Sequence, residues 1–210
     1  MRALKRLAQA AQNLVTNVRG DYEAVMTYRG KYNADAKSWG EFPIDVVKKV
    51  GVQMMVAVRV MHFVRDAGVP LAPQVASRMI RHLYGADIHW DAQFAPGVSI
   101  IHGQGLVVSH AARVSEGCIL FQGVTLGEGR DGDTQSVGSP TLEKDVHIGP
   151  NAVILGPIRV GEGSKIMATS VLTQSVPKSS LVSPGDTKIS ARKPLKTNDS
   201  KDTSGRGEHA

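Results

Sequence analysis

The feature that most constrains the fold of this chain is a six-residue period that begins near residue 86. Large apolar residues recur at every sixth position in three runs, separated by two shifts of phase. The runs are Ile88, Phe94 and Ile100; then Val108, Val114, Leu120 and Leu126; then Leu142, Ile148, Ile154, Val160, Ile166 and Leu172. Turn-forming Gly, Asn, Asp or Ser residues interrupt the alternation in each hexad. This pattern predicts short strands at the sides of a triangular coil, with three hexads in each turn of a solenoid.

The composition agrees with a solenoid of this kind. Only 5% of the 210 residues are aromatic, whereas hydrophobic residues make up 41% and there are 22 glycines. Stacked coils bury aliphatic side chains against the coils above and below them. A β-sandwich would instead place its strands about 8 to 12 residues apart with variable turns. The regular period therefore favours the solenoid over the sandwich.

Residues 1–85 follow a helical period. Leu4, Leu7, Ala11, Leu14 and Val18 form one apolar stripe at alternating steps of three and four. A second helix is predicted from Pro43 to Ala67 and a third from Pro73 to Tyr84, with residues 29–42 as a loop. The expected fold class is α+β, with an α-helical region at 1–85, the solenoid at 86–187 and a tail at 188–210 that is too polar to order itself.

Charge and composition also narrow the function. The net charge is +6, but three of these charges lie in the tail, and no recognition-helix motif or aromatic basic face indicates nucleic-acid binding. Charged residues interrupt the longest apolar stretch, Ile44 to Val64, so no membrane span is expected. The N-terminus lacks the apolar centre of a secretory signal, and Cys118 is the single cysteine. A cytoplasmic protein is expected.

The two phase shifts are candidate functional positions, because departures from a consistent pattern tend to be functional. The first, at 101–107, adds two residues and carries His102 beside Gly103. The second, at 127–141, adds about ten polar and glycine-rich residues, which predicts an external loop. His62 and His82 lie in predicted helices, where a structural role is expected. His102 is therefore the candidate catalytic histidine.

Three segments carry a resemblance to a known family: DIHWDAQFAPGVSIIHGQGLVV, ILFQGVTLGEG and SPTLEKDVHIGPNAVILGPIRVGEGSKI. Over residues 55–189 the chain resembles serine O-acetyltransferases and their relatives among the hexapeptide-repeat acyltransferases. The resemblance implies a left-handed parallel β-helix, a homotrimer or dimer of trimers, and acetyl-CoA bound as co-substrate between neighbouring subunits. It implies no metal requirement.

The resemblance also assigns catalytic roles. It implies that His102 is the general base, that Asp87 orients it, and that the backbone N–H groups of Gly127 and its neighbour stabilise the oxyanion. An alcohol is a poor nucleophile until a positioned imidazole accepts its proton, and an aspartate on the far ring nitrogen fixes the tautomer. Asp87 also follows a helix stop, so a turn or capping role remains open.

For acetyl-CoA, the resemblance implies contacts with the later coils. The residues are Gly149, Ala152, Lys165, Ala168 and Ser170, with Lys188 beyond them. The Gly-Ala-Gly of the family reads Met167, Ala168 and Thr169 here. For each lysine, a solvated surface role is the alternative to a contact with the CoA phosphates.

The acceptor positions depart from those of the serine enzymes. Family members hold the amino acid with an acid before the catalytic histidine and an Arg-His pair before the proline that closes the loop. Here these positions are Ile101, Gly138 and Ser139. Because an unpaired charge is costly to bury, a sugar or polysaccharide hydroxyl is expected as the acceptor, bound by Gln122 and Ser139.

Three alternatives remain beside this expectation. Serine is the second acceptor, and a non-catalytic hexapeptide-repeat scaffold is the other class. A zinc site of the three-histidine type would draw on His102, His110 and His147, but that type carries a pair five residues apart, whereas His102 and His110 are eight apart. The C-terminal isoleucine that docks family enzymes to a sulfhydrylase is replaced by Ala210, so no such docking is expected.

Overall fold

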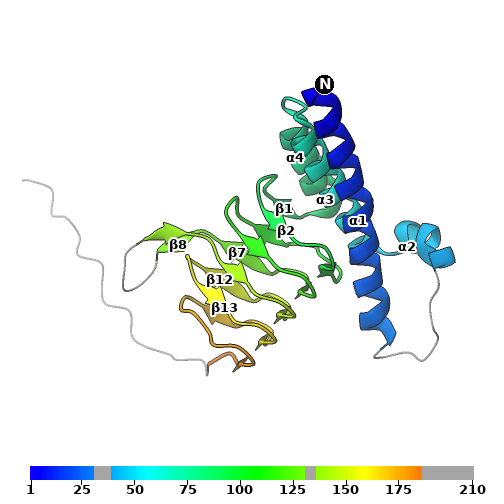
Figure 1. Ribbon diagram of the computed structural model, residues 1–210. Helices are drawn as coiled ribbons and strands as arrows, with labels where there is room; N and C mark the ends of the chain where they lie inside the picture. The colour runs from blue at the N-terminus through cyan, green and yellow to red at the C-terminus, as the bar shows by residue number, and fades with distance from the viewer. Residues whose placement is uncertain (31–38, 131–135, 186–210) are drawn as a thin grey trace, which may run out of the picture.

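The computed structural model describes residues 1–30, 39–130 and 136–185. Helices lie at one end of a stack of parallel coils (Figure 1). The helices are α1 (Arg2–Gly30), α2 (Phe42–Lys48), α3 (Val50–Ala67) and α4 (Ala72–Tyr84), with a 3-10 turn at Trp39–Glu41. The predicted tail at 188–210, and with it Lys188, lies outside the described residues.

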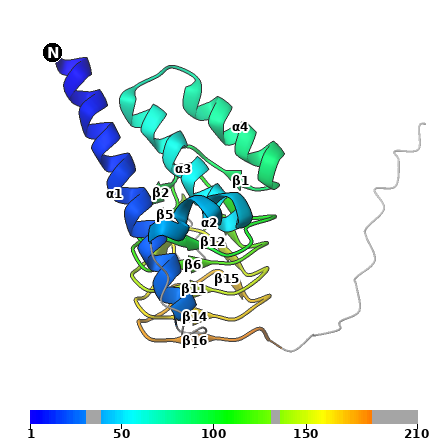
Figure 2. The same ribbon diagram turned by 90° about the vertical axis from the view of Figure 1, so that its right-hand side faces the viewer.

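Three parallel sheets form the sides of a left-handed β-helix. The first sheet contains β1 (Asp87–Ile88), β4 (Val107–Val108), β7 (Thr125–Gly127), β12 (Val153–Leu155) and β15 (Val171–Leu172). The second contains β2 (Gln93–Phe94), β5 (Arg113–Val114), β10 (Thr141–Leu142) and β13 (Arg159–Val160). The third contains β3 (Ser99–Ile100), β6 (Ile119–Leu120), β11 (His147–Ile148), β14 (Lys165–Ile166) and β16 (Leu181–Val182). Figure 2 shows the coils stacked beneath α3 and α4.

The six-residue period is confirmed as the core of the β-helix. All thirteen large apolar positions of the three runs are buried, and so are the residues two places before each of them. Matching positions stack in register, as Ile100 does on Leu120 and Leu120 on Ile148. The interior is therefore a set of aliphatic columns that run along the solenoid axis.

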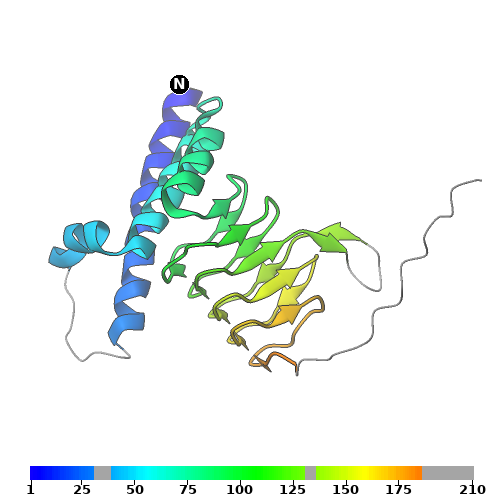
Figure 3. The ribbon, with the colours of Figure 1, turned by 180° about the vertical axis from the view of Figure 1, so that it is seen from behind.

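The second phase shift leaves the coil, as expected. An antiparallel hairpin of β8 (Gly129–Arg130) and β9 (Val137–Gly138) projects from the stack between β7 and β10 (Figures 1 and 3). Residues 131–135 at its tip lie outside the described part of the chain. Because the hairpin lies outside the coil, Thr141 of β10 pairs in register with Arg113 of β5.

The single helix predicted from Pro43 to Ala67 is wrong, because the structure divides it into α2 and α3. Lys49 between them is extended, with φ −117° and ψ 108°. The break allows α3 to approach the first coil closely at Gly51, where an added β-carbon would lie 2.1 Å from the carbonyl oxygen of Ile100. Periodicity did not reveal the break, because apolar residues recur on both sides of it, although Ile44 and Val47 of α2 are exposed in the structure.

A buried ion pair joins the helices to the first coil. Arg59 of α3, 1% exposed, donates to both carboxylate oxygens of Asp21 of α1, 4% exposed, at 2.7 and 2.8 Å. The guanidinium also donates to the carbonyl oxygens of Phe94 and Ala95, while Asp21 accepts from the N–H groups of Gly97 and Val98. This network holds three segments of the chain that are far apart in sequence.

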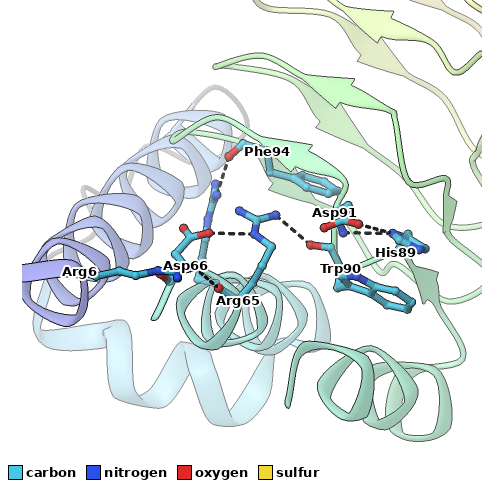
Figure 4. Close-up of polar contacts among 8 residues, drawn as sticks. Arg6, Arg65, Asp66, His89, Trp90, Asp91 and Phe94 are labelled. Atoms are coloured by element: carbon cyan, nitrogen blue, oxygen red, sulfur yellow. Dashed lines mark hydrogen bonds and ion pairs between the residues drawn. The ribbon is translucent and has the colours of Figure 1, made fainter. Parts of the chain in front are cut away.

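A second set of contacts lies at the same junction (Figure 4). Arg65 donates to the carbonyl oxygen of Trp90 at 2.8 Å and to the Asp66 carboxylate at 2.8 Å. Arg6 of α1 donates to the carbonyl oxygen of Asp66 at 2.5 Å. None of the helices in the described part of the chain is both long enough and apolar enough to span a membrane.

Candidate active site

One edge of the β-helix gathers several of the predicted site residues. We call this edge the corner column: it consists of the turns after β3, β6, β11 and β14, which lead back to the first sheet. Backbone hydrogen bonds stack the turns on one another. They are Gly123 N–H to Gln104 C=O (2.8 Å), Asn151 N–H to Gln122 C=O (3.0 Å) and Thr169 N–H to Pro150 C=O (2.9 Å). The column is a continuous track along the solenoid, with His102 in its first turn.

His102 has an unusual backbone conformation. Its φ is +65°, in the left-handed region that residues other than glycine rarely adopt, and its side chain is exposed. The next residue, Gly103, is buried with φ +83°, and an added β-carbon there would lie 2.6 Å from the Met54 methyl carbon. Helix α3 therefore packs against the turn that presents the imidazole. Several other turns of the structure also contain a non-glycine residue with positive φ, so it is the packing of α3 that distinguishes this turn.

A cleft of about 430 Å³ opens beside His102. Its walls come from α1, from the junction of α2 with α3, and from the first turn of the corner column. The residues with polar side chains that line it are Tyr28, Lys48, Lys49, His102 and Gln104. Of these, sequence reasoning found His102 alone. Lys48 and Lys49 lie inside the helix predicted from Pro43 to Ala67, and nothing in their local sequence indicates a position beside a turn some fifty residues later.

Asp87 is not in contact with His102. Its carboxylate accepts a hydrogen bond from Arg81 of α4 at 2.5 Å, and no hydrogen bond or ion pair joins it to His102 among the described residues. Asp87 begins β1 and pairs with Val107 in the next coil. The orienting role of Asp87 therefore stays a prediction, and the structure gives the carboxylate a different partner.

Gly127 and Ser139 lie at the other edge of the first sheet. Gly127 ends β7, whereas His102 precedes β4 in the same sheet of parallel strands. Ser139 follows β9 and its hydroxyl accepts a hydrogen bond from that of Ser109 at 2.8 Å. Within one chain, the predicted oxyanion donor and one predicted acceptor ligand are thus separated from His102 by the width of the sheet.

The predicted CoA residues divide into two groups. Gly149 and Ala168 lie in the corner column, where an added β-carbon on Gly149 would be 2.7 Å from the Ala168 nitrogen. Ala152 and Ser170 are 0% and 1% exposed, so they belong to the interior of the β-helix and present almost no surface to a ligand. Ala152 and Ser170 therefore contribute to the interior packing behind the column.

The remaining two predicted ligands on described residues are polar side chains. Gln122 of the corner column is half-buried, and its Oε1 has no hydrogen-bond partner among the described residues. An unpaired buried acceptor of this kind is suited to a donor group on a ligand. Lys165 is exposed on β14, beside His147 in register. Its position is compatible with a phosphate contact and with a solvated lysine.

The structure also gives the surroundings of Cys118 and of the histidines considered for a zinc site. Cys118 is buried, its thiol donates to the carbonyl oxygen of Glu143 at 3.0 Å, and burial raises the pKa of that thiol to about 12. A thiol of this kind is a poor nucleophile. Within the described residues, no group of three His, Cys, Asp or Glu side chains is placed to hold a metal ion. His110 lies instead 3.6 Å from the Glu128 carboxylate.

Sequence comparisons relate the chain to acetyltransferases. The family described as bacterial transferase hexapeptide (six repeats) matches residues 139–174. Serine acetyltransferase from Synechococcus elongatus is 38% identical over 127 residues, which are 60% of this chain and 51% of the relative. Serine acetyltransferase from Mycobacterium tuberculosis is 36% identical over 132 residues, 63% of this chain and 57% of the relative. The chain therefore spans between half and three-fifths of the length of these relatives.

Solved structures give the same relationship. Serine acetyltransferase from Brucella abortus in complex with coenzyme A is 28% identical, with a TM-score of 0.68 over 84% of this chain and 67% of that one. Serine acetyltransferase from Neisseria gonorrhoeae in complex with serine is 26% identical, with a TM-score of 0.67 over 90% of this chain and 72% of that one. The likeness extends through the helices as well as the β-helix.

Proposed function

We propose that this chain, a serine O-acetyltransferase-like member of the hexapeptide-repeat transferases, moves the acetyl group of acetyl-CoA to an acceptor hydroxyl. The position of His102, exposed at the start of the corner column and beside a cleft, is the main support for this reaction. As general base, the imidazole takes the hydroxyl proton while the hydroxyl oxygen attacks the thioester carbon. The proton then passes to the departing CoA sulfur.

Serine is the acceptor that the comparisons favour. The relatives described above are serine acetyltransferases, and one of them was solved with serine. The sugar or polysaccharide acceptor expected from the sequence receives no support from these relatives, so serine, the second acceptor considered there, takes its place. The three positions where the serine enzymes carry charged side chains are uncharged in this chain: Ile101, Gly138 and Ser139. The charged groups of serine must therefore find partners elsewhere in this chain.

Acetyl-CoA fits the corner column by the chemistry of its surface. The turns offer backbone groups at Gly149 and Ala168, and Lys165 lies on the adjoining strand. A relative was solved with coenzyme A. Met167 is about half exposed where the family has glycine, which narrows the track that the pantetheine chain would follow. CoA supplies an activated thioester, and the chain supplies its position beside His102.

The separation of His102 from Gly127 favours a site shared between two copies of the chain. Each copy offers the base at one edge of its first sheet and the oxyanion N–H at the other edge. A ring of three copies places the His102 edge of each beside the Gly127 edge of the next. Light scattering is expected to give three times 22.4 kDa or a multiple of it. A monomer at micromolar concentration contradicts the shared site.

A direct assay tests the proposed reaction. The protein is mixed with acetyl-CoA and L-serine, free thiol is followed with a chromogenic disulfide, and O-acetylserine is identified by mass spectrometry. Reactions without acceptor give the hydrolysis background, and sugars and nucleotide sugars serve as competing acceptors. Thiol release above background with an acetylated product supports the proposal. Absence of an acetylated product with all of these acceptors supports the scaffold alternative.

A further inference from the structure

The cleft beside His102 contains two lysines whose charges are used differently. The Lys49 ammonium forms an ion pair with the carboxylate of Asp45, which is buried and also accepts a hydrogen bond from the Tyr22 hydroxyl at 3.1 Å. The positive charge of Lys49 is therefore balanced by the Asp45 carboxylate within the fold. Lys48 is exposed and forms no ion pair with any described residue. Among the described lysines that line the cleft, Lys48 is therefore the one whose charge is not balanced by an ion pair.

The adjoining backbone adds to this positive potential. Val50, Gly51 and Val52, the first turn of α3, line the same cleft. The N-terminal turn of an α-helix carries a partial positive charge, and the first turn of this helix contains no acidic residue to neutralise it. The extended backbone at Lys49 ends α2 and starts α3 at this point. Lys48 and the helix terminus thus present positive charge to one cleft.

We propose that Lys48 binds an anionic group of the acceptor, a carboxylate or a phosphate, whose hydroxyl is thereby directed to His102. This inference rests on the proposed acetyl transfer and names the class of acceptor. Lysine is a compact charge on a flexible stem, so it accepts either anion without a fixed geometry. Serine meets the requirement through its carboxylate. Gly138 and Ser139 carry no charge, and Lys48 assigns recognition of the acceptor to the helical region instead.

Four three-carbon acceptors separate the charge from the hydroxyl. Glycerol is neutral, glycerate carries a carboxylate, glycerol 3-phosphate carries a phosphate, and L-serine carries a carboxylate with an ammonium. The wild-type KM for at least one anionic acceptor is expected to be about tenfold below that for glycerol, the typical effect of one charged hydrogen bond. The comparison of glycerate with glycerol 3-phosphate distinguishes the two anions.

Two lysine variants give the matched test. Lys48→Met keeps the aliphatic stem and is expected to raise the KM of the anionic acceptors about tenfold, while kcat and the KM for glycerol and acetyl-CoA change little. Lys178→Met, an exposed lysine near the far end of the solenoid, is the control and should leave every constant unchanged. Equal KM values for anionic and neutral acceptors in the wild type overturn the proposal. A rise for all acceptors alike in Lys48→Met also overturns it, because it indicates a structural role.

Binding without turnover keeps this inference separate from the proposed reaction. Calorimetric titration of the wild type and of Lys48→Met with glycerol 3-phosphate, glycerate and glycerol requires no acetyl transfer. Saturable binding of an anion that is lost in Lys48→Met supports the anionic subsite even if no thiol is released, and the proposed reaction alone then fails. If no anion binds in preference to glycerol, the subsite is wrong, whatever the outcome of the activity assay.

Discussion

Gly51 lies so close to Ile100 that an added β-carbon would be 2.1 Å from the Ile100 carbonyl oxygen. The first turn of α3 therefore rests on β3, the strand that leads into His102. Because the obstructing atom belongs to the backbone, no side-chain rotation can relieve the contact. The position of His102 thus depends on a helix–strand contact that only glycine permits.

Gly51→Ala is expected to destabilise the protein by about 1 to 3 kcal/mol, the usual cost of overpacking. The substitution would otherwise stabilise a helix by up to about 1 kcal/mol, so the sign of the effect identifies the contact. Activity should fall more than the loss of folded protein accounts for, because β3 and His102 must move. Urea unfolding and the thiol assay measure the two effects.

A control on the same helix isolates the contact. Val60 of α3 is 44% exposed, and Val60→Ala leaves the approach to β3 untouched. Its effect on activity should be negligible. An unchanged or increased stability of Gly51→Ala contradicts the close contact.

Asp21→Asn tests the buried ion pair with Arg59. The amide keeps an acceptor for the Gly97 N–H but leaves the guanidinium buried without a counter-charge. Breaking a buried pair from one side costs about 3 to 5 kcal/mol, so the urea midpoint should fall strongly. As a control, Glu23→Gln removes an exposed pair with Arg19 and should change stability by less than about 1 kcal/mol. Similar small losses in both variants contradict the role of the network.

The stability of the fold is expected to fall in acid because of His62. Burial, followed by the positive charges of Arg65 and Arg59, lowers the pKa of His62 to about 3. The unfolded chain binds a proton near pH 6.5, whereas the folded chain keeps His62 neutral, so stability present above pH 6.5 is lost as pH falls toward 3. The slope is about 1.4 kcal/mol for each pH unit in that window.

Unfolding by urea at several pH values measures this slope. His62→Phe removes the titration and should be less sensitive to pH between 6 and 4 than the wild type. His82→Phe, at an exposed position of α4, should keep the wild-type slope. Parallel curves for the wild type and His62→Phe contradict a neutral buried His62.

The repeat region was predictable from the sequence because each hexad specifies its own strand, turn and buried position. Leu142 through Leu172 follow a period of six without a shift, and all of them are core residues. The helical region was less predictable. The break at Lys49 depends on the tertiary approach of Gly51 to Ile100, which leaves no trace in local periodicity.

The sequence predicted part of the candidate site and missed another part. His102 was found because it lies where the period shifts. Lys48 was missed, since its relation to His102 depends on how the helices sit on the first coil. Ala152 and Ser170 were chosen from motif position, but both belong to the interior of the β-helix.

If His102 is the base in acetyl transfer from acetyl-CoA, its replacement by alanine should abolish most of the turnover. The turnover rate of His102→Ala is measured by thiol release with L-serine at saturating acetyl-CoA, alongside the affinity for CoA by calorimetry. We expect kcat to fall by about 10² to 10⁴ while the CoA affinity is unchanged, since a general base contributes about that much to the chemical step. A His102→Ala protein with the kcat of the wild type would show that His102 is not the base.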